Sequence, residues 1–256
     1  MNYERNNLIF VGSNEVSNQL FESSIKSYYQ TKRIEIMKKL KIEDNLPNKG
    51  MTPIVLLKPK ADKGISVMNA LKKRRTIREI SEKKLSLQTL SDLLWSACGI
   101  NRRIGPFGIP GRTAATASNS QEIDVYVALE EGTYCYDAIH HTLIPVVVGD
   151  LRSLAIGQGQ VNFGDKAPVR LIYVADINKL ANTAGYQEPG LQNPEVQKSY
   201  YFVDTGIIAG NVYIFAASQG LASWFHNCNK PSLTAKLNLR SDQRVLFGQT
   251  VGYLKK

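Results

Sequence analysis

The 256-residue sequence predicts an α+β fold, with helices around one mixed or mostly antiparallel sheet. Three observations indicate it. Apolar residues recur at helical spacing in several segments, the longest at 196–218. Short apolar or alternating runs indicate strands, and two of them, 132–138 and 141–148, are close enough to form a hairpin. The composition, 43% hydrophobic and 21% charged, is that of a globular protein large enough to bury a core.

The N-terminal part predicts a helix followed by an extended segment. Residues 14–41 show helical spacing, and basic residues crowd the end of this stretch, where they suit the helix dipole. Residues 45–50 then break the pattern, and 52–59 read as an extended, buried apolar run. We therefore expect residues 1–55 to be an N-terminal helical extension and 56–256 to be the main domain.

The next segment predicts two helices and a loop. A turn at 62–64 precedes a short helix at 65–73. Ser86 is suited to cap a second helix, which Gly99 ends. Residues 99–111 hold four glycines and two prolines, which is typical of a mobile loop.

The second half predicts most of the sheet and its longest helix. The largely apolar run 169–175, in which Arg170 is the one charged residue, indicates a buried central strand. Gly206 and Gly210 in the long helix would let another helix approach closely. The remaining expected elements are strands at 123–129, 221–226 and 245–253 and a helix at 232–237.

Several classes of protein are disfavoured by the composition. No apolar run approaches the roughly 20 residues of a membrane helix, and the N-terminus lacks a secretory pattern, so we expect a cytoplasmic protein. Three scattered cysteines argue against a disulfide framework. His226 and Cys228 have no convincing further metal ligands, so no metal is expected. The net charge of +10 is diffuse and lacks interleaved aromatics, so nucleic acid is not an expected partner.

Familiar catalytic motifs are also missing. The sequence has no Walker loop, and Gly164 stands at the wrong offset from Gly157 and Gly159 for a dinucleotide fingerprint. No serine stands in the context of a nucleophile elbow.

Two polar segments indicate a site instead. Arg74, Arg75 and Arg78 offer planar guanidinium groups for a phosphate, and Thr76 adds a hydroxyl, although the cluster could also be a helix end that caps its own dipole. In the segment 115–121, small residues alternate with hydroxyls and amides that suit a flat heterocycle, or a turn before the next strand. Together they indicate two walls of a site for a phosphorylated cofactor.

Four segments carry a family resemblance. They read Arg-Arg-Thr-Ile-Arg from Arg74, Leu-Ser-Asp-Leu-Leu-Trp-Ser-Ala-Cys-Gly-Ile-Asn-Arg from Leu90, Arg-Thr-Ala-Ala-Thr-Ala-Ser-Asn-Ser-Gln-Glu-Ile-Asp-Val-Tyr-Val from Arg112, and Asp-Thr-Gly-Ile-Ile-Ala-Gly-Asn from Asp204, followed by Gln-Gly-Leu-Ala-Ser from Gln219. In this order, over residues 65–253, the chain resembles the nitroreductase family of FMN-dependent oxidoreductases. It is most similar to the branch that includes azoline-oxidising dehydrogenases.

The resemblance implies a nitroreductase-like FMN-binding domain and a homodimer with two FMN sites at the subunit interface. It assigns the FMN phosphate and ribityl chain to Arg74, Arg75 and Thr76, and the N1–C2=O edge of the ring to Arg78. Thr116, Ala117 and Asn119 would come from the other subunit, and Gln160 would read the pyrimidine edge. The backbone of His226, Asn227 and Cys228 would approach N5 and O4.

The sequence departs from the family pattern in places. Ala115, Thr116 and Ala117 replace a proline-serine-serine wall, and Glu122 replaces a proline. Lys255 or Lys256 is the candidate for a further basic phosphate contact. The lysine-tyrosine pair associated with azoline oxidation is not identifiable, so this activity is not favoured.

The expected reaction is the reduction of a nitroaromatic, quinone or similar acceptor by NADH or NADPH through flavin N5, with no catalytic side chain required. Three alternatives remain. One is a flavin dehydrogenase acting on a modified peptide or another small substrate, and one is an interaction protein on the same fold that has lost its cofactor. The third is a basic RNA- or DNA-binding module, which would need its aromatic residues on one exposed face.

Overall fold

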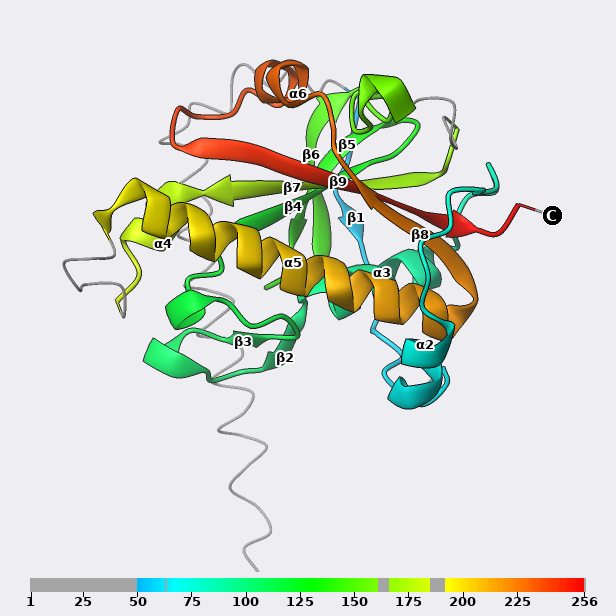
Figure 1. The fold of residues 1–256 in the computed structure, drawn as a ribbon, viewed down its shortest axis with the longest axis horizontal. Coiled ribbons are helices and arrows are strands. Elements are labelled where there is room, and N and C mark those ends of the chain that lie inside the picture. The colour runs from blue at the N-terminus through cyan, green and yellow to red at the C-terminus, as the bar shows by residue number, and fades with distance from the viewer. Residues whose placement is uncertain (1–49, 63, 161–165, 185–191, 256) are drawn as a thin grey trace, which may run out of the picture. The chain divides into compact units, whose positions relative to one another are not determined.

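A computed structural model describes residues 50–62, 64–160, 166–184 and 192–255 (Figure 1). The helix expected at 14–41 and most of the expected N-terminal extension lie outside these residues. The chain from residue 48 onward forms one compact unit. Strand β1 (Ile54–Val55) pairs with β6 inside this unit, ahead of the expected boundary after residue 55.

The core of the fold is a seven-stranded sheet in the order β1-β6-β5-β4-β7-β9-β8, and every neighbouring pair is antiparallel. This confirms the expected α+β class with a central antiparallel sheet. The other strands are β4 (Ile123–Ala128), β5 (Gly132–Asp137), β6 (Thr142–Val148), β7 (Val169–Asp176), β8 (Leu221–His226) and β9 (Gln243–Tyr253).

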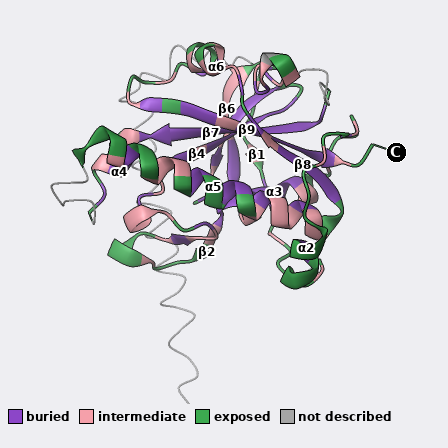
Figure 2. Ribbon diagram, in the orientation of Figure 1, coloured by how far each residue is buried: buried purple, intermediate pink, exposed green. Residues whose placement is uncertain are grey.

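Strand β7 is the buried strand that its apolar run predicts. All eight of its residues are buried, and it lies between β4 and β9, with Leu171 opposite Val127 on one side and Gln249 on the other. Figure 2 shows the buried residues concentrated along these interior strands. A strand covered on both faces needs apolar side chains at most positions, which explains the run. Arg170 is the exception within it, and it is buried too.

Helices cover both faces of the sheet (Figure 1). The long helix α5 (Pro194–Gln219) packs with α2 (Val67–Lys73) and α3 (Leu87–Cys98) on one face, over the largest of the three core clusters of the described residues. Helix α6 (Lys230–Lys236) covers the second cluster through Leu233. The short helix α4 (Ile177–Ala181) follows β7 directly.

The helix ends follow local chemistry. Ser66 and Ser86 accept hydrogen bonds from backbone amides in the first turns of α2 and α3, and α3 ends at Gly99, as expected. Helix α5 ends at Gly220, whose φ of 67° suits a residue without a Cβ.

Two local expectations were wrong. The segment 99–111 forms a two-stranded antiparallel sheet of β2 (Ile100–Arg102) and β3 (Gly111–Arg112), joined by the 3-10 turn η1 (Pro106–Gly108). The segment 52–59 is not a buried run, because Leu56 is buried while Val55 is 70% exposed. A two-residue edge strand alternates its side chains between core and solvent.

Candidate functional site

The basic segment lies against the edge of the sheet. Arg74 ends α2, and the chain then passes β8, where the Ile77 amide donates to the Ser223 carbonyl at 3.0 Å. Ile80 forms an isolated bridge with Leu254, just beyond β9. These backbone contacts place residues 74–78 in a fixed position beside the edge strand.

Two aromatic residues align the basic side chains. The Arg74 guanidinium lies 5.6 Å from the centre of the Tyr213 ring, and that of Arg78 lies 5.2 Å from the Trp224 ring. The hydroxyls of Thr76 and Tyr213 are 3.1 Å apart. Tyr213 comes from α5 and Trp224 from β8, so helix and sheet together hold the segment, and its three arginines remain exposed.

The C-terminal residues reach the same place. The Lys255 backbone amide donates to the Glu79 carbonyl at 3.1 Å, next to Arg78, and Lys255 is exposed. The backbone of Lys255 thus lies next to the basic segment, and Lys255 stays the candidate for a further phosphate contact. Lys256 lies outside the described residues.

The end of β8 continues this surface. The ring of His226 lies 4.7 Å from that of Trp224, and the exposed Asn227 follows at the strand end. Buried His226 pairs its Nδ1 with the Asn227 carbonyl at 2.8 Å and its Nε2 with the Thr250 hydroxyl at 2.7 Å. Desolvation lowers the pKa of His226 to about 4, so the side chain is a neutral structural group. A ligand there would therefore meet backbone groups and the exposed Asn227, but not the His226 ring.

Cys228 does not act as a thiol nucleophile in this arrangement. It is buried in the second core cluster, below α6, and burial raises its pKa to about 11. A protonated thiol inside a core packs like a small apolar side chain.

The Gln160 side chain has an unsatisfied hydrogen-bond acceptor. Its side-chain oxygen is buried and receives no hydrogen bond from the described residues. A Cβ placed on Gly157 would lie 3.1 Å from that oxygen and 3.8 Å from the Asn227 Cβ, so Gln160 and Asn227 flank the same glycine. A buried acceptor without a donor is unfavourable, and a ligand N–H would satisfy it.

The second predicted wall forms a tightly bonded loop. The Asn119 amide donates to the carbonyls of Pro106 and Ile109 at 3.3 and 3.2 Å, and its oxygen accepts from Gln121. The Thr116 hydroxyl accepts from the Gln121 backbone amide at 3.1 Å. The Asn119 side chain thus joins this loop to the β2–β3 hairpin, and what the loop presents outward is mainly backbone and small side chains.

Helix α5 separates the two walls. The Ala117 amide donates to the Asp204 carboxylate at 2.9 Å, whereas Thr76 and Arg74 contact Tyr213. Asp204 and Tyr213 are nine positions apart, which is about 13.5 Å along the helix and half a turn around it. The structure thus brings together Arg74, Thr76 and Arg78, and it holds Thr116, Ala117 and Asn119 on the opposite side of α5.

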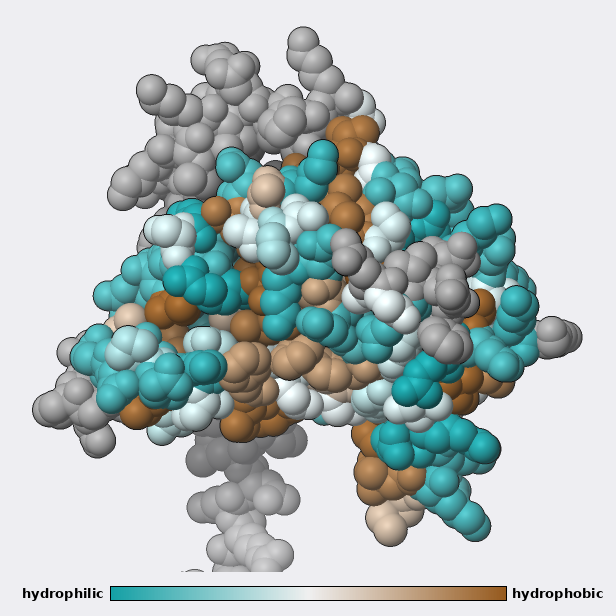
Figure 3. Space-filling model, turned by 45° about the horizontal axis from the view of Figure 1, so that its top comes forward, coloured by the Kyte–Doolittle hydropathy of each residue, from teal (hydrophilic) through white to brown (hydrophobic). Residues whose placement is uncertain are grey.

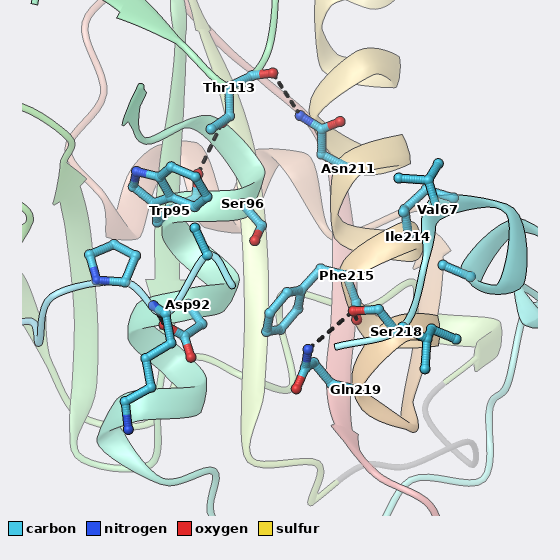
Figure 4. Close-up of a pocket in the computed structure, with 15 residues that line it drawn as sticks. Val67, Asp92, Trp95, Ser96, Thr113, Asn211, Ile214, Phe215, Ser218 and Gln219 are labelled. Carbon is cyan, nitrogen blue, oxygen red and sulfur yellow. Dashed lines mark hydrogen bonds between the residues drawn. The ribbon is translucent and has the colours of Figure 1, made fainter. Parts of the chain in front are cut away.

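A cavity of about 460 Å³ lies beside α5 but away from these residues (Figure 4). Trp95 from α3 and Phe215 from α5 face it, as do Asp92 and Asn211. The Asn211 amide is bound to the carbonyls of Ala97 and Thr113, and Asp92 accepts from the Lys60 amide and from Gln88. None of the predicted site residues lines this cavity.

The sequence reasoning missed three residues that shape the site: Tyr213, Trp224 and Asp204. Each one is a polar or amphipathic side chain within an otherwise apolar segment, and such side chains usually find a partner when buried. Their partners are distant in sequence, so only the folded chain identifies them.

Within the described residues, no helix is both long and apolar enough to span a membrane, and no cluster of three or more potential metal ligands occurs.

Comparisons with known proteins agree with this fold. The model of the nitroreductase family matches residues 71–253. MJ1384 of Methanocaldococcus jannaschii, whose name places it among the nitroreductases, is 28% identical over 166 residues, which cover 62% of this chain and 77% of that protein.

Solved structures show the same similarity. One is the crystal structure of a protein from Ralstonia eutropha JMP134 that is described as a nitroreductase. It is 31% identical, with a TM-score of 0.68, over 80% of this chain and 91% of that one. The Escherichia coli microcin synthetase McbBCD complex shares the fold, with a TM-score of 0.59 and 16% identity over 86% of this chain and 81% of that one. The NADPH:FMN oxidoreductase of Vibrio harveyi also shares it, with a TM-score of 0.50 and 16% identity over 74% and 69% of the two chains.

The family match covers most of the chain and includes the basic segment, the central helix and the strand-end loop, so this protein belongs to the nitroreductase family of oxidoreductases.

Proposed function

We propose that this chain is an FMN-dependent oxidoreductase that uses NADH or NADPH to reduce a small acceptor such as a nitroaromatic or a quinone. The observation that carries the proposal is the surface from Arg74 to Gln160. It has fixed cations at one end, aligned by Tyr213 and Trp224, and a buried acceptor without a donor at the other. FMN carries a phosphate and an imide N–H at opposite ends, so it fits both requirements.

The residues would divide the work by their chemistry. Arg74, Arg75 and Thr76 would hold the phosphate and ribityl chain through charge-assisted hydrogen bonds. Arg78, held over Trp224, would favour negative charge at the N1–C2=O edge, and Gln160 would accept from the ring imide.

The strand-end loop would supply backbone rather than side chains. The buried side chains of His226 and Cys228 fix the loop, so that the backbone of 226–228 can approach N5 and O4. FMN, when bound, accepts and donates hydride at N5. No protein acid or base is required at that atom.

We further propose that the protein is a homodimer and that the partner supplies the second wall. Within one chain, α5 keeps Thr116, Ala117 and Asn119 away from Arg74, so one FMN can contact both walls only if they come from different subunits.

The outer face of α5 fits such a dimer. Val203 and Ile207 are 60% and 37% exposed, and a Cβ placed on Gly206 or Gly210 would meet no other described part of the chain within 4 Å outside the helix's own turns. Figure 3 shows apolar side chains exposed along the lower edge of the molecule, where α5 and α2 lie. Small residues on such a face allow two helices to approach closely.

The test is FMN titration of the purified chain, followed by anaerobic addition of each nicotinamide while flavin absorbance is recorded. We expect binding and bleaching by NADH, NADPH or both. A protein that neither carries nor takes up FMN contradicts the proposal. If FMN binds but neither NADH nor NADPH bleaches it, the proposed electron donor is wrong. That result would favour a flavin dehydrogenase that oxidises another substrate.

A further inference from the structure

Two buried carboxyl groups lie beneath the loop 116–121. Glu122 follows the loop with no exposed surface, and its Oε2 accepts from the Ser120 hydroxyl at 2.6 Å. Asp204 on α5 is 3% exposed, and its Oδ2 accepts from the Ala117 amide at 2.9 Å. Each acid therefore holds a different point of the same loop.

The two acids also meet each other. Their side chains are within hydrogen-bonding reach, while the second Glu122 oxygen, Oε1, is buried and receives no donor from the described residues. Two ionised carboxylates can only accept, and they repel. A hydrogen bond between them forms only when one carries a proton.

The charged groups on the surrounding elements are engaged elsewhere. Arg112 on β3 donates to the Gln121 side chain at 2.7 Å. Asp176 at the end of β7 pairs with Arg240 at 2.8 Å, and Asp124 on β4 pairs with Lys179. Because these charged side chains are bound to other partners, the simplest group that can link Glu122 to Asp204 is a proton.

The loop needs such support because its backbone is strained. Ser118, Asn119 and Gln121 all have positive φ, between 49° and 55°, which side chains with a Cβ seldom adopt. Contacts from outside the loop must keep it in this form.

We propose that Glu122 and Asp204 share one proton and that this pair positions the 116–121 loop for the cofactor. The second half of this inference rests on the proposed FMN function. Both acids are positioning residues: they act through the loop and not on the reacting atoms.

The pH dependence follows with a definite sign. Desolvation, followed by the neighbouring Asp204, raises the pKa of Glu122 to about 7, and desolvation also raises the pKa of Asp204. The unfolded Glu titrates near its ordinary value of about 4.3. The stability contributed by the proton is therefore fully present below that value and is lost as the pH rises to about 7.

Glu122→Gln separates a shared proton from an ordinary ionised contact. Its amide can donate to Asp204 permanently while its oxygen accepts from Ser120. We expect a wild-type Tm that falls between pH 5 and 8, and a variant that lacks this fall and melts roughly 3–10 °C higher at pH 8. Asp176→Asn is the control, because it removes an ionised partner of Arg240 and should lower the Tm at pH 8.

Infrared spectroscopy can detect the shared proton in the wild-type protein itself, so this test does not depend on whether a variant folds. We expect the carbonyl band of a buried protonated carboxyl at pH 6, which disappears by pH 9 and is missing in Glu122→Gln. Absence of that band at pH 6, or a variant that is less stable than wild type at pH 8, overturns the shared proton.

FMN binding tests the positioning role. We expect equal affinities at pH 6 and, at pH 9, about tenfold tighter binding by Glu122→Gln, which corresponds to about one pKa unit of coupling. Equal affinities at both pH values overturn the positioning role. If neither protein binds FMN, the proposed function fails, and hydrogen exchange of the Ala117 amide at the two pH values decides whether the pair holds the loop. Equal protection in the two proteins overturns the role.

Discussion

The hydroxyls of Tyr213 and Thr76 lie 3.1 Å apart, although the residues are 137 positions apart in the sequence. The same Tyr213 oxygen accepts from the Phe225 backbone amide at 2.8 Å. One phenol thus joins the central helix, the edge strand and the basic segment. It also places its ring beneath Arg74.

Removing this hydroxyl should loosen all three elements. In Tyr213→Phe, the ring remains for Arg74 but the Phe225 amide loses its acceptor. We expect a loss of about 1–2 kcal/mol in the free energy of unfolding, measured by urea denaturation. Thr76→Val is the matched control, because it removes only the exposed hydroxyl and should change stability by less than about 0.5 kcal/mol. Equal losses in the two variants would contradict the role given to Tyr213.

Arg74→Ala should weaken FMN binding. A charge-assisted hydrogen bond to phosphate contributes about 1.5–3 kcal/mol, so we expect a Kd about 10- to 100-fold higher by fluorescence titration. Lys236→Ala on α6 removes an exposed positive charge from another part of the chain and serves as the control for net charge. If both variants bind alike, the basic segment does not hold the phosphate.

The sequence predicted the fold well where local pattern decides structure. The buried strand β7, the α3 cap at Ser86 and the stop at Gly99 follow from runs and capping chemistry, and all three were confirmed. The hairpin at 100–112 was missed, because glycines and prolines are typical of loops and of tight turns alike.

The candidate site was predictable only in part. The arginines stand out as a charge cluster within five positions, but Tyr213 and Trp224, which align them, come from an apolar helix and strand. Asn119 looked like a free donor, and the structure shows its amide joining two loops. Such partners depend on long-range packing, which no local pattern encodes.

Gly210→Trp should prevent dimer formation while the chain still folds. Apart from the helix's own turns, no described residue lies within 4 Å of a Cβ at this position, and the helix gains propensity when glycine is replaced. We expect a monomer by light scattering. Lys198→Trp, on another face of α5, should leave the dimer intact. A dimer in both cases would show that α5 is not the interface.

His226 should make stability fall in acid. Its pKa is lowered to about 4 by burial, while the unfolded side chain titrates near 6.5, so protons bind the unfolded chain first as the pH falls below 6.5. We expect His226→Gln to remove a loss of about 2.5 kcal/mol in the free energy of unfolding between pH 7 and 4.5, measured by urea denaturation at both values. Parallel profiles for the two proteins would argue against this.

Gly248 on β9 lies directly opposite His226 on β8. A Cβ there would lie 2.4 Å from the Ala155 carbonyl and 2.7 Å from the His226 ring. Gly248→Ala should therefore lose about 1–3 kcal/mol through overpacking. Gly159→Ala, whose Cβ would meet no described residue within 4 Å beyond its chain neighbours, should remain within about 0.5 kcal/mol of wild type by the same denaturation assay.

The half-turn between Asp204 and Tyr213 has a genetic consequence in the proposed dimer. Each chain would lend its loop to one flavin and its arginines to the other. Two chains defective in different walls, one lacking Arg74 and the other lacking the Asp204 anchor, would be inactive separately. Mixed together, they would form heterodimers in which one of the two sites is built wholly from intact parts. Activity would thus reappear by complementation between two inactive alleles.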